Sequence, residues 1–338
     1  MATIRDVAAR ARVSTGTVSN VLNRSAEVGP ALRKRVNAAI RELEYHRDEV
    51  ARSLRIRQTN VVGMVVPNVS DPFFPTVVRG VEDTLDRRGY TLIVGNSDSK
   101  LDKERKYYQT FMGKKVDGLV MIISPAQRAP EYLVHHKSNK VPIVYVGRMH
   151  PELQGDSVML DDLGGSQQAV SHLLQRGHRR IGVVTGPLDL LDARLRLQGY
   201  KLALQERGIW PEEELIRQGH YDVRSGYEQT KALISLSPRP TGLFSSNHQM
   251  TIGCFQALAE AGMHSGEVAL VSFDDLEWFS LLRPSITAIR QPAYDLGAVA
   301  ADVLVQRLTR ESTGPPHCRV IQGELIIRES SKSPACQG

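Results

Sequence analysis

Residues 3–23 read TIRDVAARARVSTGTVSNVLN and contain two apolar stripes at helical spacing. The first stripe consists of Ile4, Val7, Ala8 and Ala11, and the second of Val18, Val21 and Leu22. Between them Arg12-Val13-Ser14 interrupts the pattern, and Ser14 or Thr15 is a suitable N-cap for the second helix. Two short helices joined by a tight turn are typical of a helix-turn-helix, whose second helix enters the DNA major groove.

A third helix is expected to begin at Pro30, because proline suits a first helical position and an apolar stripe follows it. That stripe consists of Leu32, Val36, Ala39, Ile40 and Leu43. The outward positions of the second helix are small and polar: Thr15, Gly16, Thr17, Ser19 and Asn20. Hydroxyl groups can bond phosphates or base edges, and an Asn amide can pair bidentately with adenine. A small three-helix bundle with a polar exterior is the alternative to a DNA-binding head.

Positive charge is concentrated at this end of the chain. Residues 1–60 contain twelve Lys or Arg and six Asp or Glu, an excess of +6 that equals the formal net charge of all 338 residues. A basic module joined to a neutral body indicates a polyanion partner for the first part and a different partner for the second. A charge excess by itself is more often a solvated surface, but the turn, the polar helix and the charge together favour DNA.

Composition excludes several classes of protein. Hydrophobic residues make up 41% and charged residues 24%, which is ordinary for a globular protein and unlike disordered, collagen or coiled-coil chains. The three cysteines, Cys254, Cys318 and Cys336, lack metal-ligand or redox spacing, so we expect reduced thiols, no metal and no cofactor. Because neither an apolar signal stretch nor a run of about 20 apolar residues is present, we expect a cytoplasmic protein without membrane contact.

From residue 60 onward, short apolar runs alternate with helical patterns. The expected strands are Val61–Val66, Tyr90–Gly95, Gly118–Ile123, Ile143–Val146, Ser157–Leu160, Ile181–Thr185, Gly242–Ser246, Ala269–Phe273 and Ile286–Ile289. Near-continuous apolar strands that alternate with helices predict parallel, doubly wound sheets buried on both faces. This part is longer than one such sheet normally needs, so we expect two lobes with a ligand in the cleft between them.

Both parts of the chain resemble the lactose-repressor/galactose-repressor family. The head is similar in residues 3–23, and the hinge that follows it is similar in Tyr45 and Val50–Leu54. The body is similar in residues 175–182 (QRGHRRIG), 196–200 (RLQGY), 239–241 (RPT) and 271–275 (VSFDD). The resemblance implies an all-α helix-turn-helix head and an α/β two-lobed body like the periplasmic sugar-binding proteins, with two doubly wound parallel sheets. It also implies a homodimeric transcriptional regulator, a repressor, that binds a pseudo-palindromic double-stranded DNA operator and a small effector.

The resemblance further implies domain boundaries. We expect a DNA-binding head at 1–46, a hinge helix and linker at 47–60, and an effector-binding and dimerisation body at 61–338. Within the body, lobe 1 spans about 61–161 and 291–320 and lobe 2 about 162–290 and 321–330, with crossings near 161, 290 and 320. The residues expected to contact DNA are Thr3, Ser14, Thr15, Gly16, Thr17, Ser19, Asn20 and Asn23 in the head and Arg52 and Leu54 in the hinge. Leu54 is expected to wedge into a base step in the minor groove.

Two positions depart from the family pattern of the head and hinge. Arg47-Asp48 stands where family hinges usually have Pro-Asn, which weakens the stop between the third helix and the hinge. Arg12 occupies a turn position where glycine or asparagine is common. If the backbone of Arg12 is left-handed, the strain is about 1 kcal/mol, which packing can tolerate.

Eight residues at family ligand positions are expected to line the effector site: Phe73, Phe74, Arg148, Arg196, Tyr221, Asn247, Asp274 and Gln291. The alternative to ligand binding for Phe73 is a role as a core or lobe-surface aromatic. For Asp274 the alternative is a role as a helix cap. Arg196 can clamp hydroxyls or a carboxylate with its fixed donor fork, although an ion pair with Asp192 is its alternative. Tyr221 and Trp278 are weaker candidates for an apolar wall.

Other departures in the body concern effector specificity. Asn247-His248 replaces the usual Asn-Asp, Gly147-Arg148 replaces the usual Asp-Arg, and Leu190 stands where some relatives have arginine. The absence of two carboxylates beside Arg148 and Arg196 lowers the cost of binding an anion. We therefore expect local positive charge in the cleft and an acidic effector, such as a sugar acid or phosphorylated sugar, with a purine as the alternative. The sign of the response to the effector stays open.

Two other function classes fit the sequence less well than a regulator does. An enzyme is disfavoured because the chain has no phosphate-loop, dinucleotide-binding, nucleophile-elbow or H-E-x-x-H motif. A secreted solute-binding protein fits the body, but the basic head argues against it. The end of the chain, Ser330–Gly338, has no heptads that would form a tetramer, so a dimer is expected.

Overall fold

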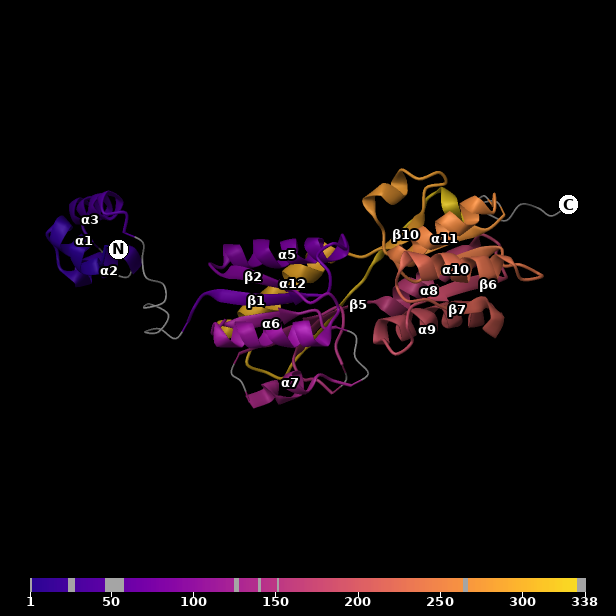
Figure 1. Ribbon diagram of the computed structural model, residues 1–338, viewed down its shortest axis with the longest axis horizontal. Coiled ribbons are helices and arrows are strands. Elements are labelled where there is room, and N and C mark those ends of the chain that lie inside the picture. Colours follow the sequence, from indigo (N-terminus) through magenta and orange to yellow (C-terminus); the bar gives the residue numbers. More distant parts are fainter. Residues whose placement is uncertain are drawn as a thin grey trace. The chain divides into compact units, whose positions relative to one another are not determined.

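The computed structural model describes residues 2–23, 28–45, 58–124, 128–138, 141–150, 152–263 and 267–332. The chain divides into two compact units, Met1–Thr59 and Asn60–Gly338 (Figure 1). The hinge departures at Arg47 and Asp48 and the expected DNA contacts of Arg52 and Leu54 lie outside the described residues. No helix in the described part of the chain combines the length and apolar character needed to cross a membrane.

The described residues of the first unit form the helices α1 (Ile4–Ala11), α2 (Thr15–Asn23) and α3 (Pro30–Glu42), as the sequence predicted. Their apolar stripes meet in one small core formed by Val7, Ala8, Ala11, Val18, Val21, Val36 and Ala39. Because each helix is too short to be stable alone in water, this shared core holds the head together. The helix-turn-helix prediction is confirmed.

The turn between α1 and α2 is held by side chains. Arg12 has a left-handed backbone with φ of 50°, and the Arg35 guanidinium of α3 donates to the carbonyl oxygens of Ala11 and Arg12. Ser14 caps α2, since its Oγ accepts the backbone N–H of Thr17 at 3.0 Å. These hydrogen bonds offset the backbone strain that arginine causes at a position suited to glycine.

Lobe 1 of the body is a six-stranded sheet in the order β11-β5-β4-β3-β1-β2. Its strands are β1 (Val61–Val66), β2 (Thr91–Asn96), β3 (Gly118–Met121), β4 (Ile143–Val146), β5 (Asp156–Leu160) and β11 (Cys318–Ile321). The helices α5 (Phe73–Arg87) and α12 (Ala293–Leu308) cover one face. The other face is covered by α6 (Leu101–Gly113), α7 (Glu131–Val134) and the 3₁₀ turn η1 (His135–Ser138).

Lobe 2 repeats this architecture with the strand order β12-β10-β9-β8-β6-β7. Its strands are β6 (Ile181–Thr185), β7 (Ile216–Gln218), β8 (Gly242–Ser245), β9 (Ala269–Phe273), β10 (Thr287–Arg290) and β12 (Glu324–Ile326). Helices α8 (Asp162–Gln175) and α9 (Leu191–Gln205) cover one face, and α10 (Val223–Ile234) and α11 (His248–Glu260) cover the other. Short 3₁₀ turns are η2 (Glu213–Leu215), η3 (Glu277–Ser280) and η4 (Glu329–Ser331).

The chain passes between the two sheets three times (Figure 1). It leaves lobe 1 after β5, returns after β10, and crosses again between β11 and β12. All three passages lie at the end of the sheets where the parallel strands finish. Because β12 enters lobe 2 at the edge where β10 leaves it, the two strands pair antiparallel, whereas the other pairs are parallel. The predicted pair of doubly wound sheets is confirmed, with this one antiparallel strand.

An ion-pair cluster fixes two of the passages. The Asp275 carboxylate, whose side chain is 4% exposed, accepts two hydrogen bonds of 2.8 Å from Arg328, just after β12. Arg290, the last residue of β10, donates to the same carboxylate at 3.0 and 3.1 Å. Asp275 therefore clamps the strand that leaves lobe 2 to the strand that returns to it.

Two buried histidines hold the last described residues against lobe 2. His172 Nε2 lies 2.8 Å from Ser331 Oγ, and His178 Nε2 lies 2.9 Å from the carbonyl oxygen of Lys332. Burial lowers the pKa of both imidazoles. The neutral rings therefore serve as hydrogen-bonding groups of the fold.

Replacing Gly80 by alanine is expected to destabilise lobe 1. A Cβ atom at Gly80 of α5 would lie 2.0 Å from the carbonyl oxygen of Tyr294 in α12, so the two helices would have to separate. Overpacking of this kind costs about 1–3 kcal/mol. Urea unfolding of Gly80→Ala measures the loss.

Gly113→Ala is the matched control, since a Cβ at Gly113 in α6 meets no atom within 4 Å. Its free energy of unfolding is expected to stay the same or to rise by up to about 1 kcal/mol. Equal destabilisation by both substitutions would contradict the close approach of α5 and α12.

Candidate functional site

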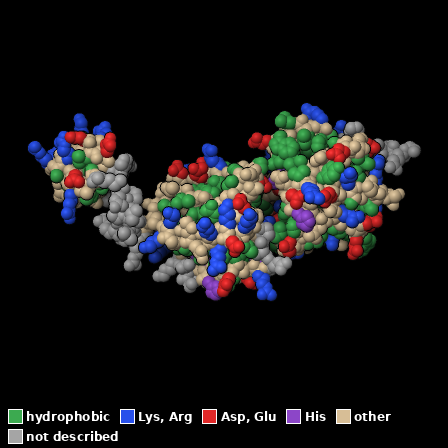
Figure 2. Space-filling model, in the orientation of Figure 1, with side chains coloured by type: hydrophobic (Ala, Val, Ile, Leu, Met, Phe, Trp, Pro, Cys, Tyr) green, Lys and Arg blue, Asp and Glu red, His purple; other side chains and the backbone are tan. Residues whose placement is uncertain are grey.

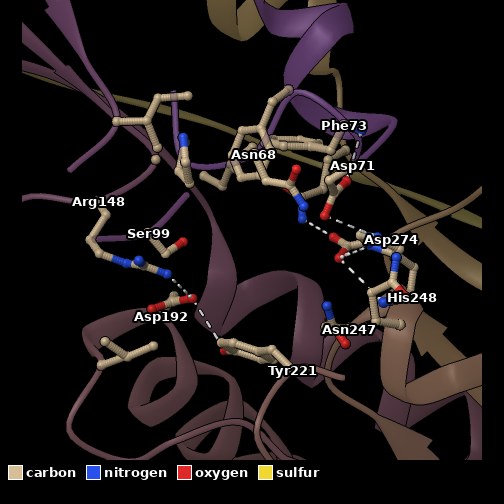
Figure 3. A pocket seen from close by; sticks show the side chains of 18 of the residues that line it. Asn68, Asp71, Phe73, Ser99, Arg148, Asp192, Tyr221, Asn247, His248 and Asp274 are labelled. Atoms are coloured by element: carbon tan, nitrogen blue, oxygen red, sulfur yellow. Dashed lines mark hydrogen bonds and ion pairs between the residues drawn. The ribbon is translucent and has the colours of Figure 1, made fainter. Parts of the chain in front are cut away.

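A cavity of about 680 Å³ lies between the lobes and is lined by residues from both. Its walls come from segments that follow strands: Asn68 after β1, Arg148 after β4, Asn247 after β8 and Asp274 after β9 (Figure 3). Parallel strands that end at a common edge bring such segments together. The volume is in the range of small-molecule sites, which is about 300–1,000 Å³.

All eight residues predicted for the effector site line this cavity: Phe73, Phe74, Arg148, Arg196, Tyr221, Asn247, Asp274 and Gln291. Phe73 and Phe74 stack edge to face with ring centroids 5.3 Å apart. Asn247 caps α11, where its Oδ1 accepts the backbone N–H of Met250 at 2.8 Å. Trp278 does not line the cavity, because it lies in η3 against Phe279. Its expected place in an apolar wall is wrong.

The first charged bridge across the cavity joins Arg148 of lobe 1 to Asp192 of lobe 2. Arg148 Nη2 lies 3.2 Å from Asp192 Oδ2, and the Tyr221 hydroxyl donates to the same oxygen at 3.1 Å. Burial tends to raise the pKa of Asp192, but Arg148 and Arg196 outweigh it and the net shift is downward. Asp192 is therefore an ionised acceptor at neutral pH.

Arg196 pairs with Asp162 rather than with Asp192. Its Nε and Nη2 lie 2.8 Å from Asp162 Oδ1, and its Nη1 donates to the carbonyl oxygen of Ser246 at 2.6 Å. The guanidinium carbon lies 3.9 Å from the centroid of the Phe273 ring, a cation–π contact. Arg196 is thus a rigid, already neutralised part of the cavity floor.

The second charged bridge joins Asp71 of lobe 1 to Asp274 of lobe 2 through His248 (Figure 3). His248 Nε2 lies 3.3 Å from Asp71 Oδ2, and Nδ1 lies 3.1 Å from Asp274 Oδ2. Gln291 donates to the other oxygen of Asp274. Burial tends to lower the pKa of His248, but its contacts with Asp274 and Asp71 raise it to about 9. The ring is therefore an imidazolium at neutral pH.

His248 was predicted only as a departure from a motif, and Asp71 was not predicted as a site residue. Asp71 lies within Ser70-Asp71-Pro72-Phe73-Phe74, directly before the predicted aromatic pair. The missed signal was a carboxylate at the end of the first strand, where ligand-binding side chains gather.

The prediction of positive charge in the cleft is wrong. Five aspartates belong to the cavity lining: Asp71, Asp192 and Asp274, and the more exposed Asp189 and Asp222. The cations in its lining are Arg148, Arg196 and His248, and each already has a carboxylate partner. The described lining residues therefore offer an added anion no unpaired cation, which raises the cost of binding it in a partly desolvated site.

Some buried polar atoms around the cavity have no hydrogen-bond partner among the described residues. They include Arg148 Nε, Asp192 Oδ1 and Gln291 Oε1. One is a donor and two are acceptors, and a buried polar group without a partner costs free energy. Such an arrangement suits a ligand that has both hydroxyl donors and hydroxyl acceptors.

The polar face of α2 is the candidate DNA-binding surface of the head. Thr15 and Gly16 are exposed, and Thr17, Ser19 and Asn20 are half-buried. Asn23 ends α2. Thr3 and Ser14 have capping roles: Thr3 Oγ1 accepts the backbone N–H of Asp6 at 3.4 Å, and Ser14 caps α2. Contacts of all these residues with DNA stay predictions.

Basic side chains of α3 are a second candidate DNA-contacting feature of the head. Arg33, Lys34 and Arg41 line a depression that extends along the helix, together with Asn37. Figure 2 shows Lys and Arg side chains projecting from the head. Such cations supply phosphate contacts that position a protein on a duplex without reading its sequence.

Comparison with known proteins identifies both parts of the chain. Residues 3–48 match the family model of bacterial regulatory proteins of the lacI family, and residues 170–331 match a periplasmic binding protein-like domain. The ribose operon repressor of Escherichia coli (strain K12) is 36% identical over 92% of this chain and 94% of its own length.

Two solved structures are similar over nearly the whole chain. The Lac repressor dimer bound to operator and the anti-inducer ONPF is 26% identical, with a TM-score of 0.86 over 98% of this chain and 99% of the other. A complex of the transcriptional regulator CelR with cellobiose is 32% identical, with a TM-score of 0.74 over 98% of this chain and 100% of the other.

The free energy of unfolding is expected to fall as the pH rises from about 6.5 to about 9. The pKa of His248 rises from the ordinary histidine value of 6.5 in the unfolded chain to about 9 in the fold. Its contribution is therefore fully present below pH 6.5 and is lost as the pH rises through 9. A pKa difference of about 2.5 between the folded and unfolded states corresponds to a loss of about 3 kcal/mol in the free energy of unfolding. Urea unfolding across this pH range measures the loss.

His248→Gln should remove this alkaline loss. His178→Gln is the control, because the pKa of His178 is lowered and its contribution is lost as the pH falls below 6.5. His178→Gln should change the free energy of unfolding only below pH 6.5 and leave its alkaline dependence unaltered. An unchanged alkaline slope in His248→Gln would show that the ring does not carry the charge.

Proposed function

The chain belongs to the lacI family of bacterial regulatory proteins, and we propose that it is a transcriptional repressor whose operator affinity is controlled by a small effector in the interlobe cavity. One observation carries the proposal. A single chain joins a helix-turn-helix whose second helix is polar to a two-lobed body whose lobes meet around a polar cavity. We assign residues 1–46 to the head, 47–60 to the hinge and 61–338 to the body.

In the head, α2 reads bases from the major groove. Thr15, Gly16 and Asn20 are the base-reading residues, because they lie on its polar face and an Asn amide can pair with adenine. The basic residues of α3 bind phosphates and make the affinity depend on salt. Arg52 and Leu54 contact the minor groove from the hinge, as the family resemblance implies.

The effector is a neutral, polyhydroxylated molecule of the sugar class. The cations that line the cavity already have carboxylate partners, which disfavours anions, and the unpaired donor and acceptors match hydroxyl groups. Phe73 and Phe74 offer an apolar surface for the carbon face of a sugar ring. Similarity to a ribose operon repressor and to a regulator solved with cellobiose supports the same class, since both names refer to neutral sugars.

The regulator acts as a homodimer in the cytoplasm, where its DNA lies. Apolar side chains are exposed on both lobes: Ile93 and Val94 in the edge strand β2, and Trp278 and Leu281 near η3. In Figure 2 hydrophobic side chains gather over this part of lobe 2. A second copy that covers these residues places two heads on the half-sites of a pseudo-palindrome. The similar Lac repressor was solved as a dimer on operator.

The cavity binds its ligand without changing it chemically. The pKa values of Asp192 and Asp274 are both lowered, because nearby cations outweigh the effect of burial. Both carboxylates stay ionised near neutral pH and act as hydrogen-bond acceptors. A general acid needs a pKa near the working pH, which neither carboxylate has.

Selection of binding sites from random DNA should yield a pseudo-palindromic operator. Asn20→Ala is then expected to weaken discrimination at one base pair of each half-site by about 1–3 kcal/mol. Arg33→Ala is the control, because loss of a phosphate contact weakens binding to all sequences and reduces the salt slope by about 1. A uniform loss with Asn20→Ala would contradict its base-reading role.

A thermal-shift panel of D-ribose, cellobiose, D-gluconate, ribose 5-phosphate and adenine tests the effector class. A neutral sugar should raise the melting temperature, and Asp274→Asn should lower its affinity by about 1.5–3 kcal/mol through loss of a charged acceptor. Asp102→Asn, on the exposed first turn of α6, should leave the affinity unchanged. Stabilisation by the acids alone would contradict a neutral effector.

A further inference from the structure

Among the described residues, two charged bridges join the lobes at opposite sides of the effector cavity (Figure 3). One is the Arg148–Asp192 ion pair, and the other is the chain of contacts Asp71–His248–Asp274. We propose that His248 is a positioning residue of the effector site, which joins Asp71 of lobe 1 to Asp274 of lobe 2 and so sets the closure of the lobes. This inference rests on the proposed function, because it concerns the same cavity.

The ring of His248 lies between two anchored carboxylates: Nδ1 is hydrogen-bonded to Asp274, whereas Nε2 forms an ion pair with Asp71 at 3.3 Å without hydrogen-bond geometry. On the lobe 2 side, Asp274 Oδ2 lies 3.1 Å from the ring Nδ1 and 3.5 Å from the His248 backbone nitrogen. On the lobe 1 side, Asp71 Oδ1 accepts the backbone N–H of Phe73 at 3.0 Å, which fixes the carboxylate at the start of α5. The His248 side chain is only 3% exposed. A buried ring between two fixed groups transmits the position of one lobe to the other.

The charge balance explains why histidine can occupy this place. His248 is the first residue of α11, where the helix dipole disfavours a cation. The groups that face it are Asp71 from the loop before α5 and Asp274 from the end of β9. The positive charge of Arg196 in α9 also lowers the pKa of Asp274. Arg196 is itself paired with Asp162 of α8. The two adjacent carboxylates outweigh the dipole and burial, in agreement with the raised pKa.

An aspartate at this place, as in the usual Asn-Asp motif, would bring three carboxylates together across the cleft. Like charges at such distances repel, and the lobes would be pushed apart until a ligand or cation intervened. With histidine, the opposed carboxylates of the two lobes attract the same cation. The ligand-free cleft is therefore closed while the ring is charged, and it opens when the ring loses its proton.

The first test follows the titration of His248 in the full-length, ligand-free protein. NMR of imidazole ¹³Cε1 resonances, with the His248 signal assigned by its loss in His248→Gln, gives the midpoint. Asp71→Asn should lower this midpoint by at least one pH unit, although Asp71 belongs to the other lobe. An unchanged midpoint would overturn the proposal, because the ring would then sense only lobe 2.

The second test measures the distance between the lobes by electron–electron double resonance. Spin labels at Gln109→Cys in α6 and Ala232→Cys in α10, in a Cys318→Ser and Cys336→Ser background, report on closure. Labelled chains are diluted with unlabelled chains so that each dimer carries one labelled copy. The unsubstituted His248 protein should show a single closed distance at pH 7 and a longer one at pH 10, and His248→Gln should show the longer distance at both.

His172→Gln is the matched control, since His172 is also buried but bonds Ser331 within lobe 2. It should keep the closed distance at pH 7. If His248→Gln folds poorly, Asp71→Asn replaces it and should lengthen the distance at pH 7. Identical distances in the unsubstituted protein, His248→Gln and Asp71→Asn at both pH values would overturn the proposal. Neither test uses DNA or effector, so its failure is distinguishable from failure of the proposed function.

Discussion

A charge that is removed from water must be matched by an opposite charge or by hydrogen bonds, and the interlobe cavity is built around this constraint. Arg148, Arg196 and His248 each contact a carboxylate. Two of these four contacts, Arg148–Asp192 and His248–Asp71, reach across to the opposite lobe, so the neutralisation of charge also holds the lobes together. The same contacts underlie the proposed neutral ligand, because a cation that is already paired with a carboxylate attracts an anion less strongly.

The fold could be predicted from the sequence because its main signals are local. Alternating apolar runs identified the buried strands, whereas β7, β11 and β12 were missed because they are short and mostly not buried. The cavity-lining residues were also predictable, since they follow strands that end at one edge. Their partners were not: Asp71 and His248 are far apart in the sequence, and only the tertiary structure brings them together. Positive charge was wrongly predicted in the cleft because the carboxylate partners of its cations could not be identified from the sequence.

In the head, the sequence predicted the helices, and the structure shows what holds the turn between them. The left-handed backbone of Arg12 was foreseen as a possibility, but the role of Arg35 from α3 was not. Such a contact depends on how α3 packs, which no local pattern encodes. Thr3 and Ser14 illustrate the same limit, because a hydroxyl beside a helix start can bond the backbone as readily as a phosphate.

Asp274 and Asp275 are neighbours in the chain but belong to different assemblies. Asp274 faces the cavity with a left-handed backbone of φ 75°, while Asp275 holds the two strands that connect the lobes. One peptide bond joins them, so a rotation of the backbone that carries one carboxylate toward a ligand also turns the other. The pair thus has one carboxylate at the cavity and the other on the strands that connect the lobes. A change in the backbone at the cavity is therefore coupled to the ion pairs on the strands through which the two lobes share a backbone.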